Sequence, residues 1–428
     1  MFTSRILSSI IFTLCLPLIP LAQDSLLTQA FLEGHVRPIA SIEPAYAGME
    51  DLDFLKSELE GVSIVMLGEQ SHGDGASFLA KTRLIKYLHE ELNFDVLVFE
   101  SGLVDGDRVW QAIEAGADSL GIFDLGIFPV WTQSKQVEPL MQYVLDQAKM
   151  DSPLILAGFD IQPTGSAMPM NQRFAELKTF LNSQVGGFDE KDYPVFFKLI
   201  ADPRKAMMQK PDAVEKRSFA SEIKKLEQAI LSDETDKETL IMARSIRNLH
   251  QTFSLFWNAD LRKPGNTPHV FNIRDKGMAE NMTLLKEQIY PDKKMIVWGA
   301  NTHLGYGRGF LGGFNGREAA DPGMVPMGQY LKIDYQEQVY TISFTSYEGR
   351  IGSMRGEGYD IPAATEGTLE EKLSQLPMAQ GFLSLRNPTL NDERFAARMY
   401  GHGEMTGRWS KMTDAIFYIK TMTESTKR

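Results

Sequence analysis

Short, continuously apolar runs alternate with longer amphipathic stretches, and this alternation narrows the possible folds more than any other feature. Four apolar runs of strand length lie at residues 62–67, 95–99, 154–157 and 295–298. They are too uniformly apolar for half-exposed strands, in which apolar and polar residues alternate. Helical patterns occupy residues 77–92, 107–115 and 137–149. This order predicts an α/β fold with a mostly parallel central sheet and flanking helices, completed by later runs at 339–345 and 415–419.

Residues 166–265 interrupt the alternation, because they contain helical patterns only. Apolar residues recur at helical spacing within 174–181, 218–231 and 238–258, with charged residues on the other faces. We therefore predict that 166–265 is an inserted helical lid subdomain, and that 23–165 and 266–428 together form the α/β core. Candidate apolar walls for a substrate are Met168, Met170, Phe253, Phe256 and Trp257. Ordinary packing inside the helical subdomain is the alternative for each of them.

The first 22 residues have the features of a secretory signal peptide. A short basic start is followed by an apolar stretch broken by Pro17 and Pro20, with small residues before Gln23. We predict cleavage near Ala22 and a periplasmic or secreted mature protein; an uncleaved membrane helix is the alternative. No later stretch reaches 18 uninterrupted apolar residues, so no membrane contact is expected after cleavage.

Cysteine content and charge exclude several classes of function. The only cysteine, Cys15, lies in the predicted signal, so the mature protein could form no disulfide and use no cysteine nucleophile. Loss of one arginine with the signal changes the net charge from −12 to −13, which disfavours nucleic acid as a partner. The sequence also lacks the GxSxG, HExxH and P-loop motifs. A small molecule is the expected partner, and the oligomeric state stays open.

Acidic residues and histidines follow the predicted parallel strands. Glu69 and His72 follow the first, Glu100 ends the second, Asp160 follows the third and His303 follows the fourth. Carboxyl ends of parallel strands meet at one edge of a sheet, where ligands of open α/β sheets bind. Clustering of titratable groups at this edge predicts a catalytic site.

The corner after the first strand reads Gly68-Glu69-Gln70-Ser71-His72-Gly73. Its spacing allows the Glu69 carboxylate to orient the His72 ring, which would make His72 a general base. The helix that begins near Ser77 would direct its free N–H groups toward the same corner, in a position to stabilise an anion.

These residues also carry a family resemblance. GEQSHG at 68–73, followed by FLAKTRLIKYLHEELNFDVLVFE at 78–100, resembles the signature of the erythromycin esterase family. The resemblance continues, in the expected order, through residues 158–160, 274–281, 297–304, 327–332 and 414–419. It implies an α/β core with a helical insertion, and hydrolysis of a carboxylic ester or lactone without a metal.

The resemblance also implies roles for individual residues. His72 would activate water, Glu69 and Glu100 would orient and polarise the base and the water, and His303 would stabilise the reacting carbonyl. Substrate-binding roles are expected for Lys81 and Arg83 on the first helix, and for Asp160 and Arg274 in the later matched segments.

Two positions depart from the family pattern. Ala300 stands where many members have a histidine, and Lys81 stands where arginine is common, although the two cations are not equivalent in a bidentate contact. A macrolide substrate is therefore not assumed.

Two alternatives remain open from the residues alone. The cluster of carboxylates and imidazoles could hold a divalent metal in a metal-dependent hydrolase. A chain whose catalytic machinery had decayed at Ala300 could instead bind a small ligand without catalysis.

Overall fold

The structure is a computed structural model, and it describes residues 26–166, 170–186, 188–231, 235–259, 266–312, 323–353 and 357–428. The predicted signal peptide at 1–22 and Met168 lie outside these residues, and so does the side chain of Met170. Within the described ranges, no helix combines the length and hydropathy needed to cross a membrane.

A nine-stranded sheet forms the centre of the molecule, with the order β1-β9-β12-β7-β2-β5-β3-β4 and with β8 beside β7. The central strands run parallel to one another. They are β2 (Ile64–Glu69), β3 (Phe94–Gly102), β4 (Ile155–Asp160), β5 (Lys294–Ala300), β7 (Val339–Ile351) and β12 (Ala415–Met422). Each corresponds to an apolar run in the sequence, so the predicted α/β fold with a mostly parallel sheet is confirmed.

Shorter antiparallel strands, which the apolar runs did not predict, extend the sheet and form a second one. The extensions are β1 (Arg37–Pro38), β8 (Tyr359–Ile361) and β9 (Gln380–Ser384). The second sheet contains β6 (Leu311–Gly312), β10 (Phe395–Tyr400) and β11 (Gly403–Gly407).

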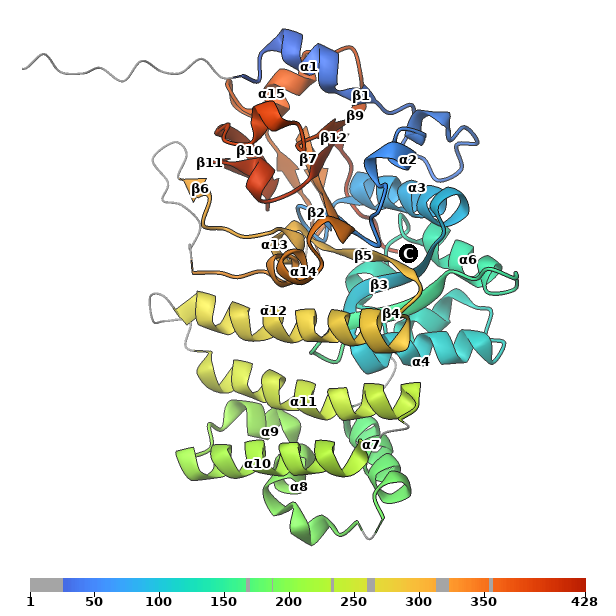
Figure 1. Ribbon diagram of the computed structural model, residues 1–428, viewed down its shortest axis with the longest axis vertical. Helices are drawn as coiled ribbons and strands as arrows, with labels where there is room; N and C mark the ends of the chain where they lie inside the picture. The colour runs from blue at the N-terminus through green and yellow to red at the C-terminus, as the bar shows by residue number, and fades with distance from the viewer. Residues whose placement is uncertain are drawn as a thin grey trace, which may run out of the picture.

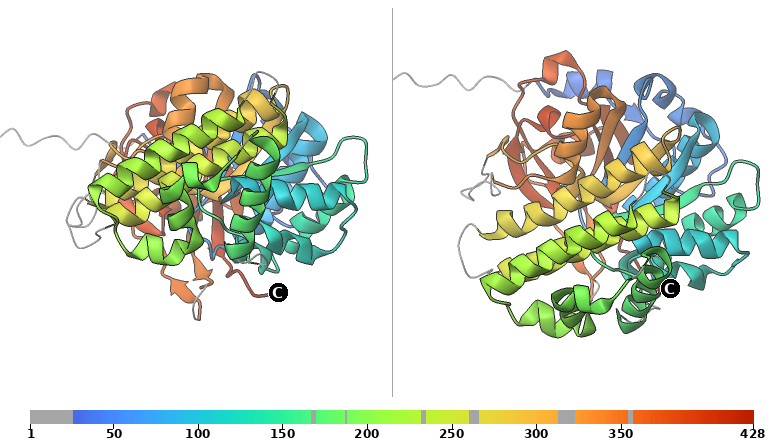
Figure 2. Two further views of the ribbon diagram at one scale, coloured as in Figure 1. Left: turned by 90° about the horizontal axis from the view of Figure 1, so that it is seen from below. Right: turned by 60° about the horizontal axis from the view of Figure 1, so that its bottom comes forward.

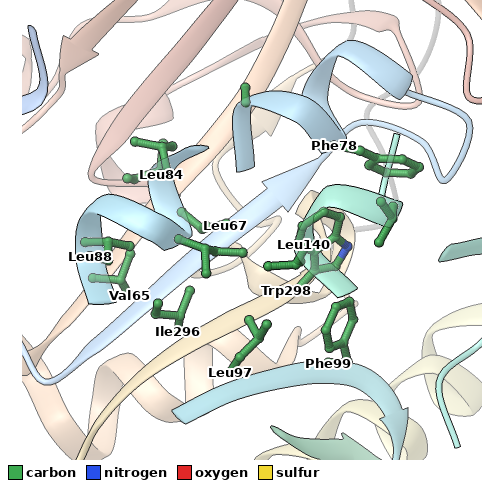
Figure 3. Close-up of a cluster of buried hydrophobic side chains, with 14 of the residues drawn as sticks. Val65, Leu67, Phe78, Leu84, Leu88, Leu97, Phe99, Leu140, Ile296 and Trp298 are labelled. Atoms are coloured by element: carbon green, nitrogen blue, oxygen red, sulfur yellow. The ribbon is translucent and has the colours of Figure 1, made fainter. Parts of the chain in front are cut away.

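Alternate residues of each central strand enter two different cores, because successive side chains of a strand point to opposite faces of the sheet. Val65 and Leu67 of β2 pack with helix α3 (Gly75–Leu92), as Figure 3 shows. Leu84 and Leu88 of α3 are at most 1% exposed, and burial of such a side chain contributes about 1.5–3 kcal/mol. The other residues of the strands pack against helix α12 (Asn266–Leu284).

Helices cover both faces of the sheet. The longer ones besides α3 and α12 are α4 (Leu103–Glu114), α6 (Glu138–Gln147) and α14 (Met327–Tyr335). Shorter helices are α1 (Gln29–His35), α2 (Leu55–Glu58), α5 (Pro129–Thr132), α13 (Asn301–Leu304) and α15 (Leu369–Ser374). Helix α12 lies between the sheet and α11, so the molecule is layered at this end (Figure 1).

The interrupting segment contains only helices among its described residues, and they lie together at one end of the molecule (Figures 1 and 2). They are α7 (Met170–Gln184), α8 (Pro194–Ala201), α9 (Pro203–Met208), α10 (Ala213–Ile230) and α11 (Lys237–Asn258). Asp212 and Asp236 cap α10 and α11 by accepting hydrogen bonds from free backbone N–H groups. Their apolar faces form a separate core around Phe196, Phe219 and Phe253.

Candidate active site

The parallel strands bring most of the predicted site residues to one cavity of about 390 Å³. His72, Glu100, Asp160, Arg274 and His303 all line it. Glu100 and Asp160 lie at or near the ends of adjacent strands β3 and β4, and His303 follows the end of β5 on α13. The expectation that distant stretches of sequence meet at the carboxyl edge of the sheet therefore matches the geometry.

Glu69 orients the ring of His72 through a hydrogen bond. The Nδ1–H of His72 donates to Oε1 of Glu69 (3.0 Å), and the Glu69 side chain is fully buried whereas the His72 ring is 32% exposed. The other carboxylate oxygen, Oε2, accepts from the Nζ ammonium of Lys81. With Nδ1 occupied, Nε2 is the nitrogen of His72 that is left for a ligand in the cavity.

The surrounding charges favour the protonated form of His72. Burial alone would lower the pKa of His72, but its hydrogen bond to Glu69 and the charge of Glu100 raise it above the ordinary value. The edge of the ring contacts Trp131 in a T-shaped arrangement, with ring centroids 5.3 Å apart. His72 is thus held both by a hydrogen bond and by packing.

Arg274 of α12 connects the remaining polar groups. Its Nε and Nη2 donate to the two carboxylate oxygens of Asp160 (3.1 and 2.7 Å), and Nη2 also donates to Glu100 (2.9 Å). Burial alone would lower the pKa of Arg274, but the charges of Asp160 and Glu100 raise it. Arg274 therefore stays charged, and its guanidinium is fixed in a bidentate geometry.

Glu100 is ionised over the whole physiological range. Burial alone would raise the pKa of Glu100, but the charges of His303 and Arg274 lower it to about 2. The backbone N–H of Ala300 donates to the second carboxylate oxygen (3.0 Å). Ala300, which takes the place of the family's histidine, therefore contributes to the site through its backbone.

Asp275 is a residue of the site that the sequence reading missed. Both of its carboxylate oxygens lie close to Nδ1 of His303, at 2.9 and 3.0 Å, and its side chain is fully buried. The other ring nitrogen of His303, Nε2, lies 3.1 Å from Nη1 of Arg274 and 3.4 Å from Oε1 of Glu100. Burial raises the pKa of Asp275. Its position next to Arg274, within a matched segment, was the signal that could have identified it.

The helical segment supplies one wall of the cavity. Met207, Thr252 and Phe256 line it, together with Phe128 at the start of α5. Phe256 was one of the predicted wall residues. Phe253 and Trp257 instead belong to the segment's own core, which was the alternative for them.

Neither of the two predicted substrate-binding residues of α3, Lys81 and Arg83, lines the cavity. Lys81 is fully buried, where it bonds Glu69 and the backbone oxygen of Gly299 (3.1 Å). Arg83 lies away from the cluster and is 1% exposed, with Nη1 donating to Asp51 (2.9 Å). Neither position therefore favours contact with a substrate. Lys81 binds the carboxylate of Glu69, and Arg83 links α3 to the loop around Asp51 through an ion pair.

The N-terminus of α3 is covered by another part of the chain. The N–H of Ala76 donates to the backbone oxygen of Thr423 (3.3 Å), and a Cβ at Gly75 would lie 2.5 Å from the backbone oxygen of Glu424. The N–H of Ala76 is therefore bonded to protein and is not free for the expected anion-stabilising role.

The described residues do not provide a donor set for a metal. Among them, no group of three His, Cys, Asp or Glu side chains has a geometry that could hold a metal ion. The guanidinium of Arg274 contacts Glu100, Asp160 and His303, so a cation of the protein already occupies the place where these donors converge.

Comparisons with other proteins identify the family. The model of the erythromycin esterase family matches residues 89–422, a range that begins after the corner with Glu69 and His72. The protein YbfO of Bacillus subtilis, which is named as a hydrolase, is 29% identical over 331 residues, covering 74% of this chain and 72% of YbfO. Erythromycin esterase type I of Escherichia coli is 32% identical over 84 residues, which cover 19% of this chain and 21% of that enzyme.

Solved structures agree in fold. A Bacillus cereus protein superposes with a TM-score of 0.72 at 20% identity, covering 94% of this chain and 98% of that protein. A mutant of the erythromycin esterase EreC in its open conformation has a TM-score of 0.68 at 19% identity, covering 90% and 97%. Because the family model spans well over half of the sequence, this chain belongs to the erythromycin esterase family and is a hydrolase of that type.

Proposed function

We propose that the protein hydrolyses a carboxylic ester or lactone with a water molecule activated by His72. The observation that carries this proposal is the orientation of the ring: Glu69 accepts from Nδ1–H at 3.0 Å, and Nε2 is left for the cavity. A general base must come within about 2.6–3.2 Å of the proton that it removes, and such a base contributes about 10²–10⁴-fold to the rate.

The reaction balances without a cofactor. Nε2 of His72 takes a proton from water as the water oxygen attacks the carbonyl carbon, which forms a tetrahedral intermediate. Collapse of the intermediate breaks the bond between the carbonyl carbon and the alcohol oxygen, and the leaving alkoxide takes the proton back from His72. The products are a carboxylic acid and an alcohol, or a hydroxy acid from a lactone.

Arg274 is the group best placed to stabilise the negative oxygen of this intermediate. Its Nη1 donates one hydrogen bond to His303 (3.1 Å), and the other N–H of Nη1 has no partner among the described residues. In this arrangement His303 and Asp275 position the guanidinium. Loss of one donor of this kind costs about 10²–10³-fold in kcat.

Replacement of His72 tests the proposal. His72→Ala should remove turnover of every ester and lactone that the parent protein hydrolyses, and the parent melting temperature should be nearly retained because the ring is 32% exposed. His35→Ala is a matched control, since His35 is exposed and lies outside the cavity. Turnover by the His72 variant at the parent rate would refute the mechanism.

Two features that we predict from the sequence complete the proposal. The helical segment 166–265 would act as a lid with Phe256 as an apolar wall, and the mature chain would reach the periplasm or the medium after cleavage near Ala22. N-terminal sequencing of the protein from the periplasmic or secreted fraction tests the second point, and an intact N-terminus there would contradict it.

A further inference from the structure

A second cavity, of about 310 Å³, also borders His72. His72 and Phe128 line both this cavity and the catalytic one, so these two side chains stand between them. None of the other residues of the second cavity lines the catalytic one. The general base therefore faces two separate spaces.

The walls of the second cavity are fixed to the turn that carries His72. The backbone oxygen of Gly73 accepts hydrogen bonds from the N–H of Gly352 (2.9 Å) and of Ser425 (2.8 Å). A Cβ at residue 73 would lie 2.1 Å from the backbone oxygen of Gly352, so only glycine permits this close approach. The second cavity is therefore walled in part by two distant segments that are hydrogen-bonded to the turn with His72.

The lining combines hydrocarbon with hydrogen-bonding groups. One side is formed by Phe128, Pro129 and Val130 at the start of α5. Gln133 and the polar residues 425–427 line the cavity as well, the latter after the end of β12. Apolar walls with a few polar groups are typical of small-molecule sites, and about 300 Å³ is the lower end of their usual size.

Ester hydrolysis requires space for two groups near the base. Water bound to Nε2 must lie about 3–3.5 Å from the carbonyl carbon, which places the carbonyl beside the ring. The acyl and alcohol groups then extend from that carbon in different directions. Because both cavities border His72, each can receive one of them.

We propose that the second cavity is a subsite for one arm of the substrate, and that the substrate is an ester or lactone with a bulky group on each side of the reacting carbonyl. The arm in the second cavity carries hydroxyl or amide groups next to hydrocarbon, because Gln133 and Ser425 face it together with Val130. This inference rests on the proposed hydrolysis of an ester or lactone, and it names the shape and chemistry of the substrate.

Filling the second cavity from its rim tests the subsite. Gln133 is exposed, so Gln133→Trp adds bulk there with little cost in folding, and Lys427→Trp adds bulk from the neighbouring C-terminal segment, where Lys427 is also exposed. Gln142→Trp is the matched control, because Gln142 is exposed on α6 and lines neither cavity. The substrates are four synthetic esters that combine a small or a hydroxylated bulky acyl group with a small or a hydroxylated bulky alcohol.

We expect Gln133→Trp and Lys427→Trp to lower kcat/KM for the ester with two bulky arms by at least about 10-fold, the scale of pocket-based discrimination. The ester with two small arms should change less than about 2-fold, and Gln142→Trp should resemble the parent on all four. Equal kcat/KM for parent and both rim variants on every ester would overturn the subsite, and so would an equal loss on the small and bulky esters.

The outcome also separates the subsite from the proposed function. Turnover that depends on His72 but is unaffected by either rim variant removes the subsite alone. Absence of turnover of all four esters by the parent removes ester hydrolysis, and the subsite with it.

Discussion

Replacement of Lys81 by methionine should destabilise the protein strongly, although Lys81 lies outside the catalytic cavity. The ammonium group bonds the Glu69 carboxylate and the backbone oxygen of Gly299, and it lies 4.5 Å from the centroid of the Trp298 ring. Lys81 and Glu69 are both fully buried, so no water can take the place of the lost cation. Methionine keeps an unbranched side chain that is one atom shorter, so the main change is in charge and hydrogen bonding.

The magnitude follows from the burial of the pair. Removal of one partner of a buried ion pair costs about 3–5 kcal/mol, because the remaining charge is left uncompensated. His72 is the other side chain that bonds Glu69 among the described residues, and it is partly exposed. We therefore expect the free energy of unfolding to fall by about 3–5 kcal/mol.

Urea unfolding followed by circular dichroism measures this effect through the shift of the midpoint. Lys86→Met is the matched control: Lys86 lies on the same helix, is partly exposed and bonds only the backbone oxygen of Pro44 among the described residues, so its loss should stay below about 1 kcal/mol. The double variant Glu69→Gln/Lys81→Met should recover part of the loss, since no buried charge remains. Equal midpoints for Lys81→Met and Lys86→Met would refute the reasoning.

Further predictions concern charge and pH. Glu100 helps to raise the pKa of His72, and His72 must be neutral to act as a base. The value of kcat/KM should therefore rise with pH through a pKa above 6.5, and Glu100→Gln should move this rise to lower pH. A rise at the same pH in both proteins would show that Glu100 does not affect the pKa of His72. The pKa of Glu100 is about 2 in the folded protein against 4.5 unperturbed, so its ionised form should contribute on the order of 3 kcal/mol above pH 4.5, and this contribution should be lost as the pH falls toward 2. Urea midpoints should show this decline in the parent and a flatter one in Glu100→Gln. Arg274→Lys, which cannot keep the bidentate contact with Asp160, should lower kcat by about 10²-fold at an unchanged fold, and parent-like kcat would remove Arg274 from the reaction. Arg83→Gln should lower stability but leave KM unchanged in steady-state kinetics; a raised KM would return Arg83 to the substrate site.

The sequence predicted the central sheet because the parallel strands are buried on both faces, so each reads as an apolar run. Glu100 and Asp160 could be predicted to lie at the same edge of the sheet because parallel strands end on the same side. Short strands such as β1 and β9 gave no comparable signal, since their positions depend on pairing with β12 and with one another.

The roles of the basic residues on α3 were harder to predict because they depend on partners far away in sequence. Lys81 lies three residues before Leu84, on the apolar stripe that faces the sheet, and this spacing could have indicated burial. The partner of Arg83 is Asp51, in a loop whose position no local pattern determines. The pairing of Asp275 with His303 likewise depends on how α12 packs against the sheet.

The helical segment has consequences for how the enzyme could diversify. Met207 and Phe256 reach the cavity from helices that have their own apolar core, whereas His72, Glu100 and Arg274 are carried by the sheet and the helix packed on it. Mutations at Met207 or Phe256 can therefore change which molecules are admitted without disturbing the groups that break the bond. Related proteins could therefore differ in substrate while they keep the same catalytic residues.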